Sequence, residues 1–220
     1  MTPSFYNSQL LVFIRQGNAE GMRDYLSTLR NTNFRMASTV LADAALWKGC
    51  QDFWHFAAVL VAANNRAYLG TMLKAAAAIS APLPTPEFAA SCTTDIDRKK
   101  VLESLLTTVR QPAEVNLLIH DFPINAPGVT EGILFRVGTS VCYFVLFNLL
   151  KQYEDRPDYL RRYGIELIRK GDKRSFNLAC VIKEYFGLAE LPGTFSLSLQ
   201  PYELSRLDTS YDTFLTILTK

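Results

Sequence analysis

The side chains that most often carry catalysis or bind metals are few in this chain. Histidine occurs twice in 220 residues, at His55 and His120. Cys50 lies five positions before His55, close to but not on one helical face, and no acidic third ligand is spaced to join them, so we interpret His55 as a core or rim residue beside Trp54. Asp121 follows His120 and could orient its imidazole, yet no Ser or Cys nucleophile is tied to this pair by sequence.

The common signatures of nucleotide, hydrolase and zinc sites are also missing from the sequence. There is no Gly-x-Ser-x-Gly, no Walker loop, no Gly-x-Gly-x-x-Gly and no Cys-x-x-Cys. Four cysteines lie far apart, three of them inside apolar helical patterns, and we expect them to be reduced core residues: Cys50, Cys92, Cys142 and Cys180. We therefore expect no cofactor and no metal ion.

Charge is nearly balanced, with 23 basic and 21 acidic residues and a net charge of +2. This balance gives no footprint for nucleic acid or a membrane surface. The one charge feature lies between residues 151 and 184, where nine residues are basic and six acidic. A solvated face with intrahelical ion pairs is one interpretation, and a contact surface for an acidic protein partner is the sharper one. The candidate partner-binding residues are Arg161, Arg162, Arg169, Lys170, Lys173 and Arg174.

Apolar periodicity predicts helices along most of the chain. Apolar residues make up 49% of it and charged residues 20%, which is ample for the core of one large domain or two small ones. Residues 194–199 alternate as a strand would, but they lack a partner strand. The predicted class is all-α. Helices are predicted over residues 10–17, 18–29, 36–49, 53–65, 68–79, 95–109, 112–120, 131–153, 157–171, 172–187 and 202–218.

The most apolar stretch, residues 131–153, is predicted to be the central helix of the second half. Its apolar residues fall on every side of a helical wheel, which is typical of a helix buried all round. Fourteen residues from Val137 to Leu150 carry no charge, fewer than the about 20 that a membrane span requires. Gly138 lies inside this stretch. A repeat would place a turn at this glycine, whereas a bundle would run the helix through it.

Residues 81–94 are interpreted as a Pro-rich surface connection. Pro82, Pro84 and Pro86 oppose a regular helix, and the Ser, Thr and Ala content supplies no core face. This connection would divide the chain into N-terminal helical hairpins, residues 1–80, and a C-terminal helical half, residues 95–220. One continuous domain is the alternative.

A short pattern of apolar and basic residues ending in glycine recurs along the chain. Gly17 and Gly49 lie 32 residues apart, and Gly138 and Gly171 lie 33 apart. Periods in this range are typical of stacked helical hairpins. Gly-Asn and Gly-Asp also make ordinary helix-to-helix turns, so an irregular helical bundle remains open. The repeated pattern stands at residues 14–18, 46–49, 135–138 and 168–172.

Two segments resemble ankyrin repeats. Residues 39–45, Thr-Val-Leu-Ala-Asp-Ala-Ala, followed by Gly49, are similar to that family's Thr-Pro-Leu-His-x-Ala-Ala helix, and residues 117–126 resemble the tail of one repeat running into the next. The chain departs from the family where Val40 stands for Pro and Ala42 for His, and it lacks the Gly-Ala before the usual Val-Asn. The resemblance covers about half of the chain and implies an α-solenoid of antiparallel hairpins that binds proteins through a groove and its turn tips.

We therefore expect a protein-interaction module, an adaptor or regulator built of helical hairpins, with another protein as its partner and no catalysis of its own. One alternative is a small helical enzyme with a pocket near His120 and Asp121, which requires a histidine within hydrogen-bond reach of a carboxylate in a concave pocket. Another is a helical-bundle regulator that acts as a homo-oligomer. The first residues lack a basic region and a long apolar run, so we expect a cytoplasmic protein or one exported without a cleaved signal peptide.

Overall fold

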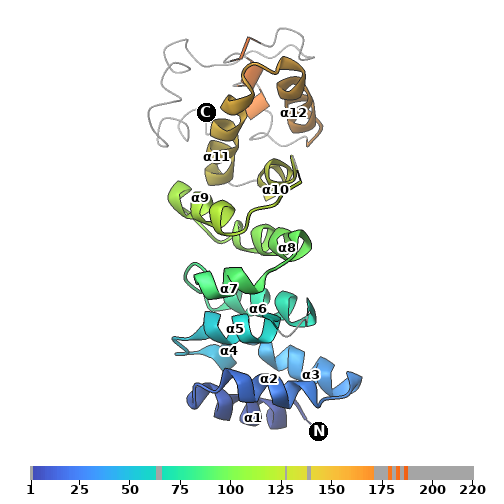
Figure 1. Cartoon of the computed structure of the whole chain (residues 1–220), viewed down its shortest axis with the longest axis vertical. Coiled ribbons are helices and arrows are strands. Elements are labelled where there is room, and N and C mark those ends of the chain that lie inside the picture. The colour runs from blue at the N-terminus through green and yellow to red at the C-terminus, as the bar shows by residue number, and fades with distance from the viewer. Residues whose placement is uncertain are drawn as a thin grey trace. The chain divides into compact units, whose positions relative to one another are not determined.

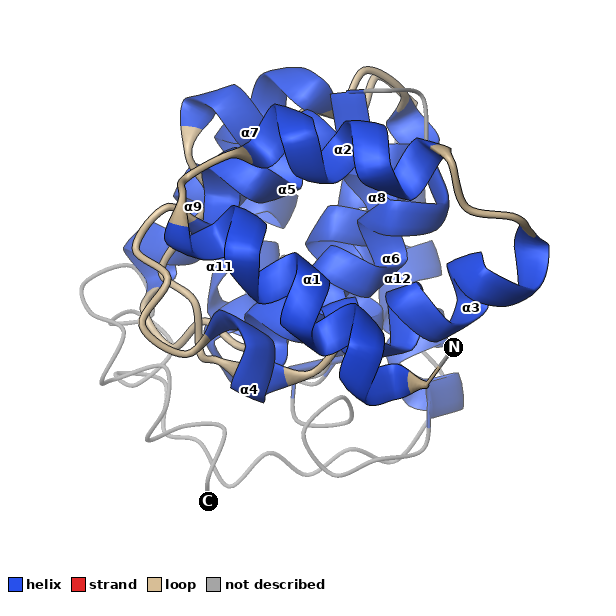
Figure 2. Cartoon of the chain, turned by 90° about the horizontal axis from the view of Figure 1, so that it is seen from below, coloured by secondary structure: helices blue, strands red, loops and turns tan. Residues whose placement is uncertain are grey.

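The computed structural model describes residues 2–62, 66–126, 128–137, 140–170, 178–179, 182–183 and 186–187. In these residues it contains twelve α-helices and one 3-10 helix, joined by loops and turns, and no strand (Figure 2). The predicted all-α class is confirmed. The helices are α1 (Pro3–Arg15), α2 (Ala19–Ser27), α3 (Asn31–Leu41), α4 (Ala44–Trp47), α5 (Phe53–Ala62), α6 (Arg66–Ala78), α7 (Pro86–Ser91), α8 (Asp95–Leu105), α9 (Pro112–Asp121), α10 (Val129–Val137), α11 (Ser140–Leu150), η1 (Lys151–Tyr153) and α12 (Pro157–Lys170).

The chain forms two compact units whose boundary differs from the predicted one. The first unit contains Met1–Val109 and Leu117–Pro127, and the second contains Arg110–Asn116 and Gly128–Lys220. Helix α9 therefore contributes residues to both units. Residues 81–94, predicted as the connection between two halves, lie wholly inside the first unit.

Most helices of the first unit pack in two series, and within each series one helix packs on the next. Helix α2 packs on α5 and α5 on α7, while α3 packs on α6 and α6 on α8 (Figure 1). The helices of the first series begin at Ala19, Phe53 and Pro86, which are 34 and 33 residues apart. Helices α1 and α4 complete the unit, since α1 contacts α2, α3 and α4, and α4 contacts α6. The helices of each series thus bury apolar faces against one another.

Three helices of this unit end in a residue with left-handed backbone. These residues are Gly17 after α1 (φ 63°), Gly49 after α4 (φ 81°) and Ser80 after α6 (φ 50°). After α1 the backbone N–H of Asn18 donates to the carbonyl of Phe13 at 2.9 Å, and the Asn18 side chain accepts from the N–H of Gly21 at 2.8 Å. The predicted helix stop at Gly17 and the cap at Asn18 are confirmed.

Ser80 makes the same kind of turn as Gly17 but carries a side chain. The backbone N–H of Ala81 donates to the carbonyl of Ala76 at 2.9 Å and that of Ser80 to the carbonyl of Ala77 at 3.3 Å, a glycine-type helix end. We expect Ser80→Gly to raise the free energy of unfolding by about 0.5–1 kcal/mol, because it relieves a strained left-handed residue at an exposed position. Urea denaturation measures the change.

Gly17→Ala, in the equivalent turn after α1, is the matched control for Ser80→Gly. It introduces a side chain into the same backbone conformation, and we expect it to lower the free energy of unfolding by about 1 kcal/mol. Equal stability of the wild-type chain and both variants would contradict the left-handed turns.

The single helix predicted over residues 36–49 is wrong, because two helices occupy this segment. Helix α3 ends at Leu41, and the Asp43 carboxylate accepts from the N–H of Ala45 at 2.9 Å to begin α4. The indole N–H of Trp47 donates to the carbonyl of Leu41 at 2.7 Å, which satisfies an acceptor at the end of α3. A capping aspartate therefore divides the helix. The ankyrin-like segment 39–45 consequently spans two helices rather than one.

The interpretation of residues 81–94 as a connection without a core face is also wrong. Helix α7 begins at Pro86, where proline occupies the first turn and needs no hydrogen-bonded N–H. The Thr85 hydroxyl accepts from the N–H of Phe88 at 3.4 Å. Phe88 and Cys92 are fully buried, and α7 packs extensively on α5. The buried side chains of Phe88 and Cys92 thus anchor this otherwise largely exposed segment in the core.

Replacing Phe88 tests whether this segment belongs to the core. The Phe88 ring lies 4.7 Å from that of Trp54 and 6.2 Å from that of Phe122, centroid to centroid. We expect Phe88→Ala to lower the free energy of unfolding by about 3–5 kcal/mol, because it leaves a cavity between these rings. Chemical denaturation provides the measurement.

Phe5→Ala serves as the control for Phe88→Ala. Phe5 lies on α1 and is 41% exposed, so its loss should cost less than about 1 kcal/mol. If Phe88→Ala lowers the free energy of unfolding by no more than Phe5→Ala does, residues 81–94 do not belong to the core.

In the second unit, the apolar stretch 131–153 is divided among α10, α11 and η1. Helix α10 packs on α11 and α11 on η1. The described side chains of this stretch are largely buried, in agreement with its predicted place in a core. The fully buried ones are Ile133, Leu134, Cys142, Leu146, Phe147 and Leu150.

Some predictions for this half fall on residues that the structure does not describe. The turn or kink expected at Gly138 lies outside the described residues, as do the helix predicted over 202–218 and most of the one over 172–187. Among the helices that are described, none is long and apolar enough to cross a membrane.

Candidate functional site

The predicted basic surface lies only in part within the described residues. On α12, Arg161 forms an ion pair with Asp158, Nη1 to Oδ1 2.6 Å, and Arg162 is exposed. This pair matches the intrahelical ion pairs of a solvated face. The backbones of Arg169 and Lys170 belong to α12, but their side chains lie outside the described part. Lys173 and Arg174 also lie outside it, so the partner surface stays a prediction.

Both histidines lie next to a carboxylate, but neither lines a cavity described below. His55 Nδ1 lies 3.0 Å from Glu87 Oε1 on α7, and both side chains are about half exposed. His120 Nδ1 lies 2.9 Å from Asp121 Oδ1, and its side chain is 84% exposed. Among the described residues no three His, Cys, Asp or Glu side chains are grouped to hold a metal ion. The predicted His120–Asp121 pair therefore forms, but on the open surface.

Two cavities in the first unit lie beside the loop between α4 and α5. This loop, residues 48–52, separates them. The aromatic cavity has a volume of about 540 Å³ and is lined by Ala44, Ala45, Trp47, Lys48, Gly49, Cys50, Gln51, Phe53, Trp54, Ile79, Ser80, Ala81 and Pro82. The α1 cavity has a volume of about 590 Å³ and is lined by Leu11, Ile14, Arg15, Ala45, Leu46, Lys48, Gly49, Cys50, Gln51, Asp52 and Phe56.

Aromatic packing on either side of the loop holds it in place. The Trp47 ring at the end of α4 meets the Phe53 ring at the start of α5 edge to face, with centroids 5.1 Å apart. Trp47 also contacts Phe56 at 5.7 Å, and Phe53 contacts Trp54 at 5.1 Å. All four rings are nearly fully buried. Both ends of the five-residue loop are therefore anchored in the core, and the left-handed Gly49 lets the chain reverse between them.

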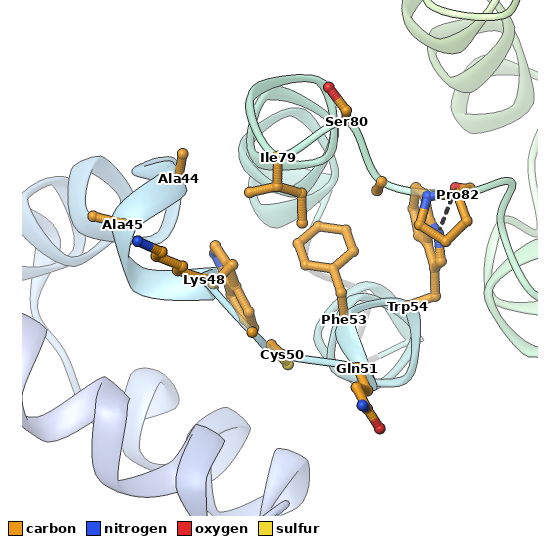
Figure 3. Close-up of a pocket in the computed structure, with 13 residues that line it drawn as sticks. Ala44, Ala45, Lys48, Cys50, Gln51, Phe53, Trp54, Ile79, Ser80 and Pro82 are labelled. Carbon is orange, nitrogen blue, oxygen red and sulfur yellow. Dashed lines mark hydrogen bonds between the residues drawn. The ribbon is translucent and has the colours of Figure 1, made fainter.

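The walls of the aromatic cavity present mainly apolar groups. Figure 3 shows Ile79 pointing toward the Phe53 ring from the end of α6. The indole N–H of Trp54 donates to the carbonyl of Pro82 at 2.9 Å, and that of Trp47 is bound to the carbonyl of Leu41. Both indole donors already have partners, and the rings themselves are nearly fully buried. The apolar surface open to a ligand therefore comes mainly from Ile79, Ala81 and Pro82.

Charged side chains stand at the rim of the two cavities. Lys48 is exposed and is the one charged residue that lines the aromatic cavity. Arg15 and Asp52, both exposed, line the α1 cavity with it. Neither Lys48 nor Arg15 forms an ion pair with any residue of the described part of the chain. Two cations and one carboxylate give this rim a positive balance.

The second unit contains a stack of tyrosines. The Tyr153 and Tyr159 rings lie 4.3 Å apart and those of Tyr159 and Tyr163 4.9 Å apart, and the Tyr153 hydroxyl donates to Glu131 Oε1 at 3.3 Å. The Arg156 guanidinium lies 5.5 Å from the Tyr159 ring centroid. Burial, followed by the hydrogen bond from Tyr159, raises the pKa of Tyr163 well above its usual value. The stacked side chains contact one another and join η1 and α12 to α10.

No family model, curated protein or solved structure matches the chain. We therefore infer the function from the geometry of the cavities and their rim.

Sequence reasoning identified neither Lys48 nor Ser80 as part of a site. The cavities combine the ends of α1, α4 and α6, and their lining residues are too far apart in the chain for a local motif. The one available signal was the recurrence of helix ends at Gly17 and Gly49, which the repeat pattern contains.

Cysteine labelling tests the exposure of the loop. Cys50 is half-buried at the cavity rim, and burial raises the pKa of its thiol above the ordinary value. Cys92 is fully buried, and burial raises its pKa to about 11, so about 0.1% of it is thiolate at pH 8. We expect a maleimide at pH 8 to modify Cys50 well before Cys92 and Cys142, with the labelled sites mapped by mass spectrometry.

Urea provides the control for this labelling, because unfolding should make the three cysteines react at similar rates. Modification of Cys92 as fast as Cys50 in the folded chain would contradict the described burial.

Proposed function

We propose that the chain is a protein-interaction module, an adaptor or regulator without catalysis of its own, whose partner is another protein. The observation that carries this proposal is that the ends of helices α1, α4 and α6 lie around one exposed loop. The last turn of α1, the Lys48–Gly49 turn after α4 and the Ile79–Ser80 turn after α6 all line the two cavities beside it.

The packing of the first unit supports this function. Helices α2, α5 and α7 pack in one series and α3, α6 and α8 in another. Stacked helical arrays commonly use their extended surfaces to bind proteins. Turns on a rigid scaffold are also where binding residues usually lie. The ankyrin-like resemblance of residues 117–126 implies the same function.

The chemistry of the described side chains favours binding over catalysis. A general base acts from within a pocket that holds its substrate. The His55–Glu87 and His120–Asp121 pairs lie outside both cavities. The cavities themselves contribute aromatic rings, one thiol and exposed charges, which suit recognition of another protein.

Cross-linking to a partner tests the function. We expect the immobilised full chain to capture a protein from an extract of the source cells, and the purified partner to form a complex of defined stoichiometry by size-exclusion chromatography with light scattering. Cross-linking mass spectrometry should then place contacts on the first unit.

Failure to obtain any saturable, stoichiometric complex with a purified protein would contradict the proposed function. Light scattering of the chain alone serves as the control, because a stable dimer without a partner would favour the homo-oligomer instead.

A further inference from the structure

The loop at residues 48–52 has the features of a contact surface for an extended segment. Its two cavities adjoin through four shared loop residues, Lys48, Gly49, Cys50 and Gln51. A compact ligand would occupy one of them, whereas an extended chain that crosses the loop can occupy both. Each has a volume typical of binding pockets, which hold roughly 300–1,000 Å³.

The aromatic cavity fits a bulky apolar side chain. Ile79, Ala81 and Pro82 supply the apolar surface that is open to a ligand, because the lining rings are nearly fully buried. The indole donors of Trp47 and Trp54 are bound within the protein. A polar group placed there would lose its bonds to water and gain few in return. An aliphatic or aromatic group has no hydrogen bonds to water to lose, and its binding removes apolar surface from water.

The rim of the cavities fits a carboxylate. Lys48 lines both cavities, and Arg15 lines the α1 cavity. Within the described residues neither cation has an ion-pair partner, and Asp52 is the one carboxylate among the lining residues. An acidic group of a partner would complement this positive rim and would orient its segment across the loop.

We propose that the protein partner binds here through an extended segment in which a bulky apolar side chain enters the aromatic cavity and a neighbouring Asp or Glu pairs with Lys48. This inference rests on the proposed function, since it assigns the segment by which that partner is recognised. Where the segment carries a second Asp or Glu, that side chain pairs with Arg15.

Tryptophan fluorescence reports this site directly. The chain contains two tryptophans, and both line the aromatic cavity. The probe is the blocked hexapeptide acetyl-Ser-Leu-Leu-Glu-Glu-Ser-amide, which does not itself fluoresce. We expect a saturable change in emission with this peptide, and about fivefold or more weaker binding for the isosteric Gln-Gln peptide, because its charges are lost. The peptide with both leucines replaced by serine should give no saturable change.

Variants of the chain separate the rim from general charge effects. Lys48→Ala should weaken binding of the Glu-Glu peptide, but by less than the Gln-Gln replacement does, because Arg15 can still pair with the second Glu. Lys99→Ala, at an exposed position of α8 away from both cavities, should leave binding unchanged. Equal binding of the two peptides, or no response to any of them, would overturn the proposal. Binding of octanoate without any peptide would assign the cavity to a small amphiphile and would also overturn it.

The captured partner distinguishes failure of this inference from failure of the proposed function. If the partner binds the wild-type chain and Lys48→Glu equally well, the segment is recognised elsewhere and the inference fails while the interaction function stands. If no protein partner exists, the function itself fails. Loss of the partner in Lys48→Glu, with retention in Lys99→Glu, supports both.

Discussion

A continuous row of contacting aromatic rings holds the first unit together. The rings of Trp47, Phe53, Trp54, Phe88 and Phe122 follow one another at centroid distances of 5.1, 5.1, 4.7 and 6.2 Å. They join α4, α5, α7 and the turn after α9, and each is nearly fully buried. Such contacts contribute about 0.5–1.5 kcal/mol each beyond the burial of their area. Helix α5 carries Phe53 and Trp54 of this row of rings and packs on α2, α6 and α7, so the unit is organised around it.

The same row of rings determines the character of the candidate site. Trp47 and Phe53 anchor both ends of the loop in the core, and four of its five residues are exposed. The hydrogen bond from Trp54 to Pro82 fixes the turn after α6 as the opposite wall. Buried rings therefore produce an apolar cavity, while the loop contributes Lys48 at the rim. The core and the candidate site are two consequences of one packing arrangement.

Local signals in the sequence predicted much of this fold, and long-range contacts account for the rest. The helices predicted over residues 112–120 and 157–171 begin where α9 and α12 do, at Pro112 and Pro157, and proline suits the first turn of a helix. The helix boundary at Asp43 was missed because a capping aspartate lay inside a strong apolar pattern. Helix α7 was missed because its burial depends on Phe88 meeting rings from distant helices. The cavities likewise combine helix ends about 30 residues apart, which no local motif reveals.

Hydrogen–deuterium exchange of the full chain, followed by mass spectrometry, tests most directly whether a core built on α5 leaves an open loop beside it. Exchange slows where amides are buried and bonded within a cooperative unit. The structure predicts slow exchange in α5, α6 and α7 together and fast exchange at residues 48–52. Fast exchange throughout α7, or protection of residues 48–52 equal to that of α5, would contradict this account.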